Sequence, residues 1–276
     1  MKRTSLIMVM LTPFCSGAFA QADPAGSYPK NDLEHHHPLA YPPLREADVV
    51  FCKRIERIID TREKKNAVMN WPKNPLSAIV HDLVDVGDSN SVGELMVYRN
   101  DSLANPMLIK DINHEGQDCE TVSIWIGPGP YDYKDTTICT NYDFSQIKRW
   151  EIVEDWIFDK QSSQFFPRIV AIAPLYSPAL NGVALNEQPM FYISWAKIRP
   201  FLAKEEIFNR ESDVRISYLD FFEQRLFSSY ITKESNDKDL AIKDMPEFKT
   251  NPMEALYESQ RIKEELINKE QGLWEY

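Results

Sequence analysis

The sequence lacks the short motifs that mark the common kinds of catalytic site. It contains no phosphate-binding loop, no dinucleotide-binding glycine fingerprint and no nucleophile elbow. His114-Glu115 lacks the second histidine of a zinc-protease helix, and Asp88-Ser89-Asn90 lacks the acidic residue that must end a calcium loop. These absences favour a protein that holds other proteins over an enzyme, and we expect no cofactor and no metal site.

Positive charge and long apolar runs are also scarce. Lys and Arg total 31 against 42 Asp and Glu, which gives a formal net charge of −11. A field of that sign disfavours nucleic acid and anionic lipid as partners. No apolar run after residue 20 approaches the roughly 20 residues that a membrane-spanning helix needs.

The N-terminal segment has the three parts of an export signal. Lys2 and Arg3 precede a short apolar run, and Ala18-Phe19-Ala20 is a small-x-small cleavage site. We therefore expect residues 1–20 to be a cleaved signal peptide. Residues 21–44 are rich in proline and contain His35-His36-His37, which predicts a solvated, extended arm. Residues 45–276 are expected to form a single domain.

Cysteine is rare, and three cysteines remain after the expected cleavage: Cys52, Cys119 and Cys139. Export permits a disulfide, and the odd number leaves one thiol over. A Cys119–Cys139 bond would close a loop of roughly twenty residues and contribute about 3 kcal/mol. Three free thiols remain the alternative, and Cys52 is expected to be buried.

Residues 45–65 are expected to form a helix dense with both signs of charge. At about 100° per residue, Cys52, Ile55, Ile58 and Ile59 share one arc that would face the core. The opposite arc would present an interaction surface formed by Lys53, Arg57 and Lys64. Arg62 falls inside the apolar arc, so it should pair with a carboxylate.

The remaining pattern predicts an α+β fold, in which an antiparallel meander packs against helices near both ends of the chain. The clearest strand signal is a hairpin over 148–175, with its turn at 160–163. Further strands are expected near 94–98, 122–127 and 190–195. Helices are expected from residue 76, around 198–203, over 218–230 and from 252 towards 271.

Two acidic residues in the predicted hairpin imply ion pairs. The hairpin register places Arg168 roughly opposite Asp155. Glu154 lies on the apolar face and therefore needs a cation, for which Arg62 and Arg168 are the candidates. Because neighbours on a strand point to opposite faces, Glu154 and Asp155 cannot act together on one substrate atom.

Several segments, spread in order over most of the chain, resemble the GldN/PorN family of gliding and type IX secretion proteins. The first is the charged segment Lys53-Arg54-x-x-Arg57-x-Ile59-Asp60-x-Arg62-Glu63-Lys64-x-Asn66. Others are Asn74-Pro75-Leu76-Ser77, Glu154-Asp155-Trp156, Arg168-Ile169, Phe222 with Arg225, and Phe227-Ser228-Ser229-Tyr230-Ile231. Residues 101–140 and the three cysteines have no counterpart in this resemblance.

The resemblance implies a non-enzymatic periplasmic subunit, peripheral to the outer membrane, that self-associates in large rings. Its implied partners are the outer-membrane lipoprotein PorK/GldK and the periplasmic parts of the motor proteins PorL/GldL and PorM/GldM. The alternative is a soluble periplasmic ligand-binding module or hydrolase that uses the aromatic residues of the hairpin.

Overall fold

The computed structural model describes residues 33, 36–84, 95–108, 110–112, 118–125, 127, 129, 133–140, 143–180, 183–184, 186–208 and 215–272. These residues belong to one compact unit that begins at Leu33. The described strands all pair antiparallel and are combined with helices, so the fold is α+β as the sequence predicted. The expected signal peptide and the first part of the proline-rich segment lie outside the described residues.

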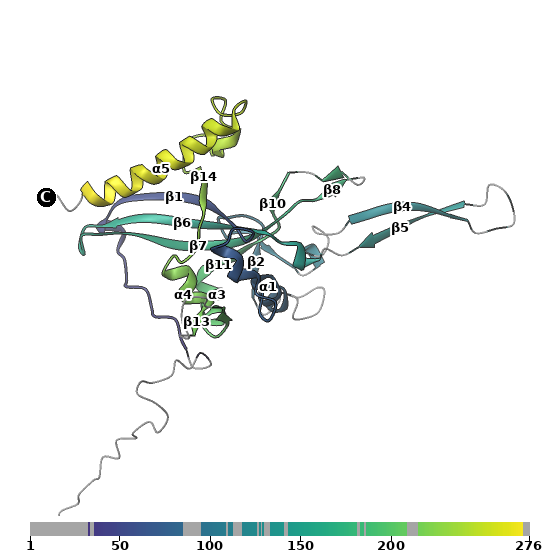
Figure 1. Cartoon of the computed structure of the whole chain (residues 1–276), viewed down its shortest axis with the longest axis horizontal. Coiled ribbons are helices and arrows are strands. Elements are labelled where there is room, and N and C mark those ends of the chain that lie inside the picture. Colours follow the sequence, from purple (N-terminus) through teal and green to yellow (C-terminus); the bar gives the residue numbers. More distant parts are fainter. Residues whose placement is uncertain are drawn as a thin grey trace, which may run out of the picture. The chain divides into compact units, whose positions relative to one another are not determined.

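Within these ranges the main sheet has eight strands, in the order β14-β1-β6-β7-β11-β2-β3, with β10 also paired to β7. Its long strands are β1 (Val49–Asp60), β6 (Arg149–Asp159) and β7 (Gln164–Tyr176), which pair antiparallel (Figure 1). The shorter strands are β14 (Tyr230–Glu234), β11 (Tyr192–Ser194), β10 (Gln188–Pro189), β2 (Val97–Tyr98) and β3 (Pro106–Met107).

The predicted hairpin over 148–175 is confirmed as β6 and β7. The carboxylate of Asp159 accepts hydrogen bonds from the backbone N–H groups of Gln161 and Ser162, which stabilises the polar turn. The register pairs Asp155 with Arg168 across the two strands, as the spacing around the turn indicated. A bulge between Val153 and Glu154 shifts this register within the hairpin.

The predicted helix over 45–65 is wrong, because this segment forms β1. Alternate residues of β1 are the more buried ones from Ile55 onward, and they include Arg57. Because a charged residue occupies the inward face, the sequence of β1 does not show the alternation of apolar and polar residues that is typical of a strand. The β-branched residues Ile55, Ile58 and Ile59 were the remaining strand signal. Cys52, expected to be buried, is exposed on this strand.

Three helices cover the larger hydrophobic cluster. They are α1 (Leu76–Val84), α3 (Trp195–Leu202) and α4 (Tyr218–Glu223). Helix α4 begins with a capping box in which Ser217 and Asp220 each bond the other's backbone. It ends well before residue 230, where β14 begins, so the single helix predicted over 218–230 is wrong in its second half. The largest buried side chains of this cluster are Trp150, Trp195, Phe191, Tyr218 and Phe222.

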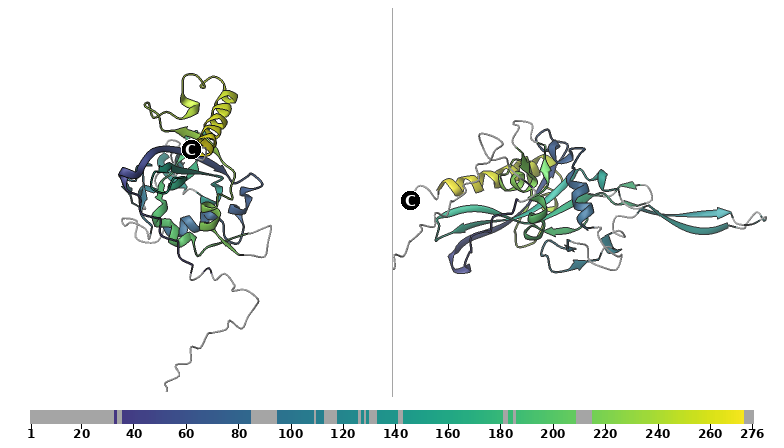
Figure 2. Two further views of the ribbon diagram at one scale, coloured as in Figure 1. Left: turned by 90° about the vertical axis from the view of Figure 1, so that its left-hand side faces the viewer. Right: turned by 90° about the horizontal axis from the view of Figure 1, so that it is seen from below.

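A second, smaller hydrophobic cluster lies under α5 (Pro252–Gly272), the helix predicted from residue 252 onward. Ile262 and Leu266 of α5 pack with Ile55 of β1 and Ile231 of β14. Figures 1 and 2 both show α5 beside the long strands, and in Figure 1 helices α3 and α4 lie on their other side. The long strands therefore contribute to two separate apolar clusters.

The second half of the predicted arm is attached to the body of the protein. Tyr41 receives a hydrogen bond from the Trp195 indole N–H at 3.1 Å, and the guanidinium carbons of Arg168 and Arg199 lie 5.2 Å and 4.0 Å from its ring centre. Arg168 also donates to the Pro42 carbonyl, and Arg199 donates to the Leu39 carbonyl. Residues 39–42 are thus held by side chains of β7 and α3.

Among the described residues, three two-stranded sheets lie outside the main sheet: β4–β5, β8–β9 and β12–β13. The longest is the hairpin of β4 (Asp118–Trp125) and β5 (Tyr133–Thr140). The sequence predicted a strand near β4 but not its partner. The small pairs are β8 (Ala179–Leu180) with β9 (Val183–Ala184), and β12 (Glu206–Ile207) with β13 (Ile216–Ser217).

Candidate functional site

Charged residues from distant parts of the chain meet around the carboxylate of Glu154, which is fully buried in β6. Arg57 of β1 and Arg225, which follows α4, each form an ion pair with this carboxylate, the latter at 2.6 Å. The Trp156 indole N–H donates to it at 2.8 Å. These four residues, Arg57, Glu154, Trp156 and Arg225, form what we call the Glu154 junction.

The backbone at Arg225 shows what this junction requires. Arg225 has a φ of 55°, in the left-handed region where the residue after a helix is usually glycine. Its N–H donates to the Phe222 carbonyl, and the next N–H donates to the Phe221 carbonyl, which closes the end of α4. A glycine would fit this backbone but could not reach Glu154. The ion pair between Arg225 and Glu154 therefore offsets the free-energy cost of the left-handed backbone at Arg225.

The Glu154 junction lies between the two hydrophobic clusters. The Arg225 guanidinium is 5.7 Å from the ring centre of Phe227, in the larger cluster, and 5.6 Å from that of Trp156, which packs on the smaller one. Burial lowers the pKa of Arg57, while the Glu154 charge opposes this effect. A buried carboxylate with two cations is costly to desolvate, so its partners must stay in place for the fold to persist.

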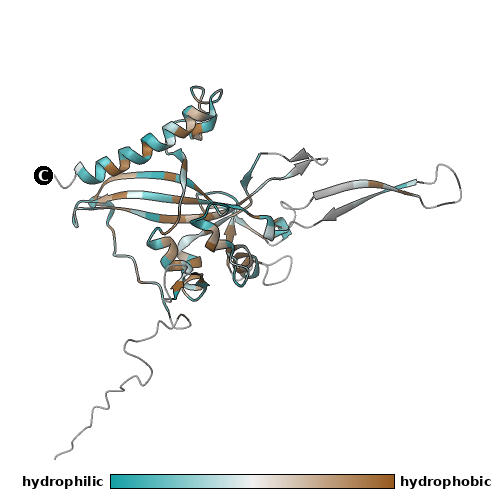
Figure 3. Ribbon diagram, viewed as in Figure 1, coloured by the Kyte–Doolittle hydropathy of each residue, from teal (hydrophilic) through white to brown (hydrophobic). Residues whose placement is uncertain are grey.

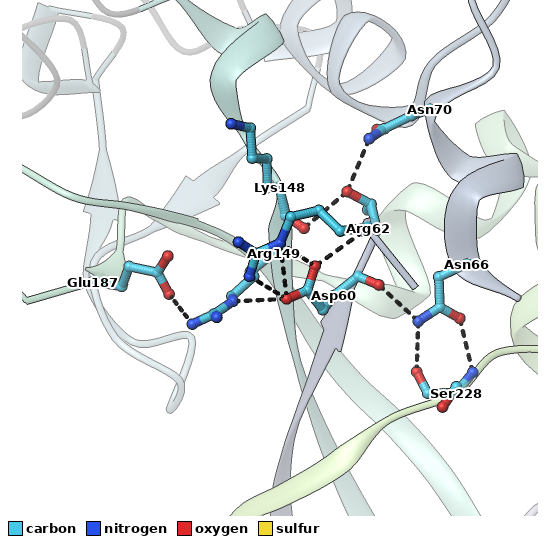
Figure 4. Close-up of polar contacts among 9 residues, drawn as sticks. Asp60, Arg62, Asn66, Asn70, Lys148, Arg149, Glu187 and Ser228 are labelled. Atoms are coloured by element: carbon cyan, nitrogen blue, oxygen red, sulfur yellow. Dashed lines mark hydrogen bonds and ion pairs between the residues drawn. The ribbon is translucent and has the colours of Figure 1, made fainter. Parts of the chain in front are cut away.

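A second polar centre, the Asp60 junction, closes the end of β1 (Figure 4). The Asp60 carboxylate accepts from the backbone N–H and guanidinium of Arg62 and from Arg149 Nε at 3.1 Å. Arg149 also binds Glu187 at 2.7 Å. Hydrogen bonds from Arg62, supported by Arg149, hold the pKa of Asp60 well below its usual range. The arginines are partly exposed, so these ion pairs contribute modestly to stability.

Asn66 supplies the buried part of the Asp60 junction. Its side-chain amide donates to the Asp60 carbonyl at 2.9 Å and to the Ser228 carbonyl at 2.8 Å. Its amide oxygen accepts from the Ser228 N–H at 2.8 Å. One side chain thus joins the end of β1 to the segment that leads into β14. Figure 4 shows Asn66 and Ser228 facing one another.

The residues predicted to pair with Glu154 lie elsewhere. Arg62 binds Asp60, and Arg168 binds the Pro42 carbonyl, so neither is the partner of Glu154. Asp155 pairs with Arg54, at 2.8 Å, although Arg168 lies opposite it in the register. The requirement for a buried cation was correctly inferred, but its identity was not.

The surface proposed from Lys53, Arg57 and Lys64 was based on a helix, and in the structure the three side chains do not form one exposed surface. Arg57 points inward and is only 6% exposed, so it cannot contribute to an outer surface. Lys53 is half-buried and pairs with Glu234 of β14. Lys64 lies in the turn after β1 and is exposed. Of the three, only Lys64 is exposed as predicted.

Sequence reasoning missed Arg225 as a partner of Glu154, and it missed Arg149 as a partner of Asp60. The helix was predicted to continue through Arg225, so this residue was read as an ordinary helix residue, although α4 ends before it. Arg149 is the first residue of β6 and lies directly opposite Asp60 in the register of β1 and β6. An acidic residue such as Asp60 at the end of a strand would have been the signal that a cation pairs with it.

A sequence model of the family described as "Gliding motility associated protein GldN" matches residues 44–275. The chain belongs to the GldN family. No curated protein matches the sequence. The charged segment that carried the resemblance supplies Arg57 to the Glu154 junction and Asp60, Arg62 and Asn66 to the Asp60 junction. In this GldN protein, much of the family-like signature therefore builds internal junctions.

Among the helices that the structure describes, none is long and apolar enough to cross a membrane. Within the same described ranges, no three His, Cys, Asp or Glu residues are grouped as a metal site would need. His36, from the predicted arm, lies with Nδ1 3.3 Å from the Ala203 carbonyl oxygen.

Proposed function

We propose that this GldN-family protein is a non-enzymatic structural subunit of the gliding and type IX secretion machinery. It works in the periplasm, peripheral to the outer membrane, and forms large ring assemblies with a lipoprotein of the PorK/GldK kind. The periplasmic parts of the PorL/GldL and PorM/GldM motor proteins lie next to it. Membership of a gliding motility associated family, over residues 44–275, is the observation that carries this proposal.

The two junctions support a scaffolding role. In the Glu154 junction, charged side chains that are far apart in the sequence bind one another. In the Asp60 junction, Arg149 pairs with Asp60, and the Asn66 amide binds the Ser228 backbone. They fix the positions of β1, β6, α4 and the segment before β14 relative to one another. A subunit that transmits or bears load in an assembly needs its elements fixed in this way, and buried ion pairs specify one arrangement over others.

Helix α5 offers a surface for a neighbouring subunit. Met253, Leu256 and Tyr257 are 56%, 54% and 67% exposed, although all three are large and apolar. Their spacing places them together on one side of the first turns of α5. We call them the α5 patch. Figure 3 shows brown bands along α5 between hydrophilic ones. Grouped exposed apolar side chains are typical of protein interaction sites.

Co-purification from the cell envelope tests the proposal. A tagged copy of the full chain should be recovered in a very large species together with an outer-membrane lipoprotein. The double variant Leu256→Asp/Tyr257→Asp should lose most of the lipoprotein while keeping the melting temperature of the wild type. Lys263→Asp is the matched control, since it adds the same change of charge at an exposed position of the same helix.

The outcomes separate the proposal from its rivals. A small monomeric species without a lipoprotein would overturn the proposed function as a whole. Recovery of an intact large complex by the double variant would overturn the α5 patch alone. Equal loss with Lys263→Asp would show that added charge, and not the apolar surface, disturbs the complex.

A further inference from the structure

The hairpin of β4 and β5 is held by few of the interactions that stabilise the rest of the fold. Within the described part of the chain, neither strand pairs with a strand outside the hairpin. Its two strands are eight residues long each. An isolated two-stranded hairpin is only marginally stable in water, so a persistent one needs a further source of stability.

Apolar burial does not supply that source at the far end of the hairpin. Val122 and Ile124 lie on one face of β4, and Trp125 lies on the other, because side chains alternate along a strand. All three are at least 41% exposed, and Tyr133, the register partner of Trp125, is 59% exposed. At these positions both faces of the hairpin are open to solvent.

The two cysteines of the hairpin occupy opposed positions. The register pairs Cys119 of β4 directly with Cys139 of β5, one step from the first pair of the ladder. Directly opposed residues of antiparallel strands have Cα atoms about 4.5–5.5 Å apart, within the range of about 4.4–6.8 Å that a disulfide requires. Cys52 lies in the main sheet, opposite Ile157 of β6.

We propose that Cys119 and Cys139 form a disulfide that closes the base of the β4–β5 hairpin and is its main stabilising bond. A small disulfide oxidant, such as oxidised glutathione, supplies the chemistry. One cysteine thiolate attacks the oxidant and releases one thiolate, giving a mixed disulfide. The second cysteine thiolate attacks that bond, forms the Cys119–Cys139 bond and releases the other thiolate. Two cysteines are oxidised, and the oxidant is reduced to two thiols.

Peptide mapping of the oxidised full chain tests the pairing. The purified protein is equilibrated with oxidised and reduced glutathione, free thiols are blocked with N-ethylmaleimide, and the protein is digested with trypsin. Cleavage after Lys134 separates the two cysteines into peptides 111–134 and 135–148, while Cys52 falls in peptide 46–53. We expect peptides 111–134 and 135–148 to be joined, two hydrogens lighter than their sum, and Cys52 to carry the label.

Limited digestion of the native protein tests the stabilising role. Trypsin should cut after Lys134, which lies in β5, about tenfold more slowly in the oxidised protein than in the reduced one. The variant Cys119→Ser/Cys139→Ser should be cut at the fast rate under both conditions, whereas Cys52→Ser should behave as the wild type. Labelling of both hairpin cysteines, a bond to Cys52 or to Cys15, or equal digestion rates would overturn the proposal.

Discussion

Arg57 and Glu154 lie on neighbouring strands of the main sheet and form an ion pair whose side chains are only 7% and 0% exposed. Replacing Glu154 by Ala would leave Arg57 buried without its carboxylate and Arg225 without its ion-pair partner. We expect the free energy of unfolding to fall by about 3–5 kcal/mol. Urea denaturation followed by circular dichroism measures this loss.

The neighbouring residue provides the control for that measurement. Asp155 pairs with Arg54, whose side chain is 37% exposed. Asp155→Ala should therefore cost no more than about 1 kcal/mol. If the two variants lose the same small amount of stability, Glu154 is not the centre of a structurally required junction.

Charge reversal should have different effects at the buried Arg57 and at the exposed Lys64. Arg57→Glu places a second carboxylate beside the buried Glu154, and we expect the variant to accumulate poorly in soluble form. Lys64→Glu changes an exposed side chain in the turn after β1, and its unfolding free energy should stay within about 0.5 kcal/mol of the wild type.

Soluble yield and thermal melting of these two variants check the expectation. A folded, normally stable Arg57→Glu protein would contradict the buried position of this side chain. If the prediction holds, only Lys64 is suited to testing whether cations near β1 contribute to an interface, because loss of complex in the Arg57 variant would report unfolding.

Asn66→Ala should weaken the end of β1 selectively. The change removes three hydrogen bonds and leaves the part-buried N–H and carbonyl of Ser228 without this partner. A fully buried group left unpaired costs about 1–3 kcal/mol, so the two part-buried groups of Ser228 should together cost about 2–4 kcal/mol. In hydrogen exchange, the Ser228 amide should lose its protection.

Asn70→Ala is the matched control for Asn66. Asn70 is exposed, and its amide donates one hydrogen bond, to the Thr61 hydroxyl at 2.8 Å. The loss should be about 0.5–1.5 kcal/mol, with no effect on the Ser228 amide. Equal losses at the two positions would show that the link between Asn66 and Ser228 contributes little.

The sequence predicts an element well where one local periodicity dominates. β6 and β7 were found because apolar and polar residues alternate across a polar turn, and α5 because Asn251-Pro252 opens a helical pattern. β1 was missed because its inward face includes Arg57. The carboxylate of Glu154 makes the burial of Arg57 tolerable, and Glu154 lies outside any local window around Arg57.

The candidate junctions were only partly accessible for a related reason. Alternation placed Glu154 on an apolar face, and elementary electrostatics then required a cation. Arg57 is 97 residues from Glu154, and Arg225 is 71 residues from it. The identity of the cations that pair with Glu154 depends on the register of β1 against β6 and on where α4 ends. Neither can be derived from spacing along the chain.

Glu151 should make the stability of the protein depend on pH. Burial, helped by the nearby charge of Glu56, raises the pKa of Glu151 from its ordinary value of 4.5 to about 7. Asp101 acts in the same direction, while Lys233 and the Tyr192 hydroxyl, which donates to Glu151 at 2.9 Å, act in the opposite one. The folded protein therefore keeps this proton up to a higher pH than the unfolded chain.

The sign of the effect follows from proton binding. Below about pH 4.5, Glu151 is protonated in both the folded and the unfolded state, so its raised pKa does not reduce the free energy of unfolding. Between about pH 4.5 and 7 the unfolded chain loses the proton first, so stability falls by up to about 3 kcal/mol and then stays level. Glu151→Gln should abolish this decline, so the difference in unfolding free energy between variant and wild type should grow from pH 4.5 to 7.

Tyr192→Phe tests the same carboxyl in the opposite direction. Loss of the hydroxyl removes a donor that favours the ionised form, so the pKa of Glu151 should rise further. The variant should then be destabilised most above pH 7, where wild-type Glu151 is ionised and accepts that hydrogen bond. Urea denaturation at a series of pH values measures both variants. Parallel curves for Glu151→Gln and the wild type would show that this buried carboxyl does not titrate in the expected range.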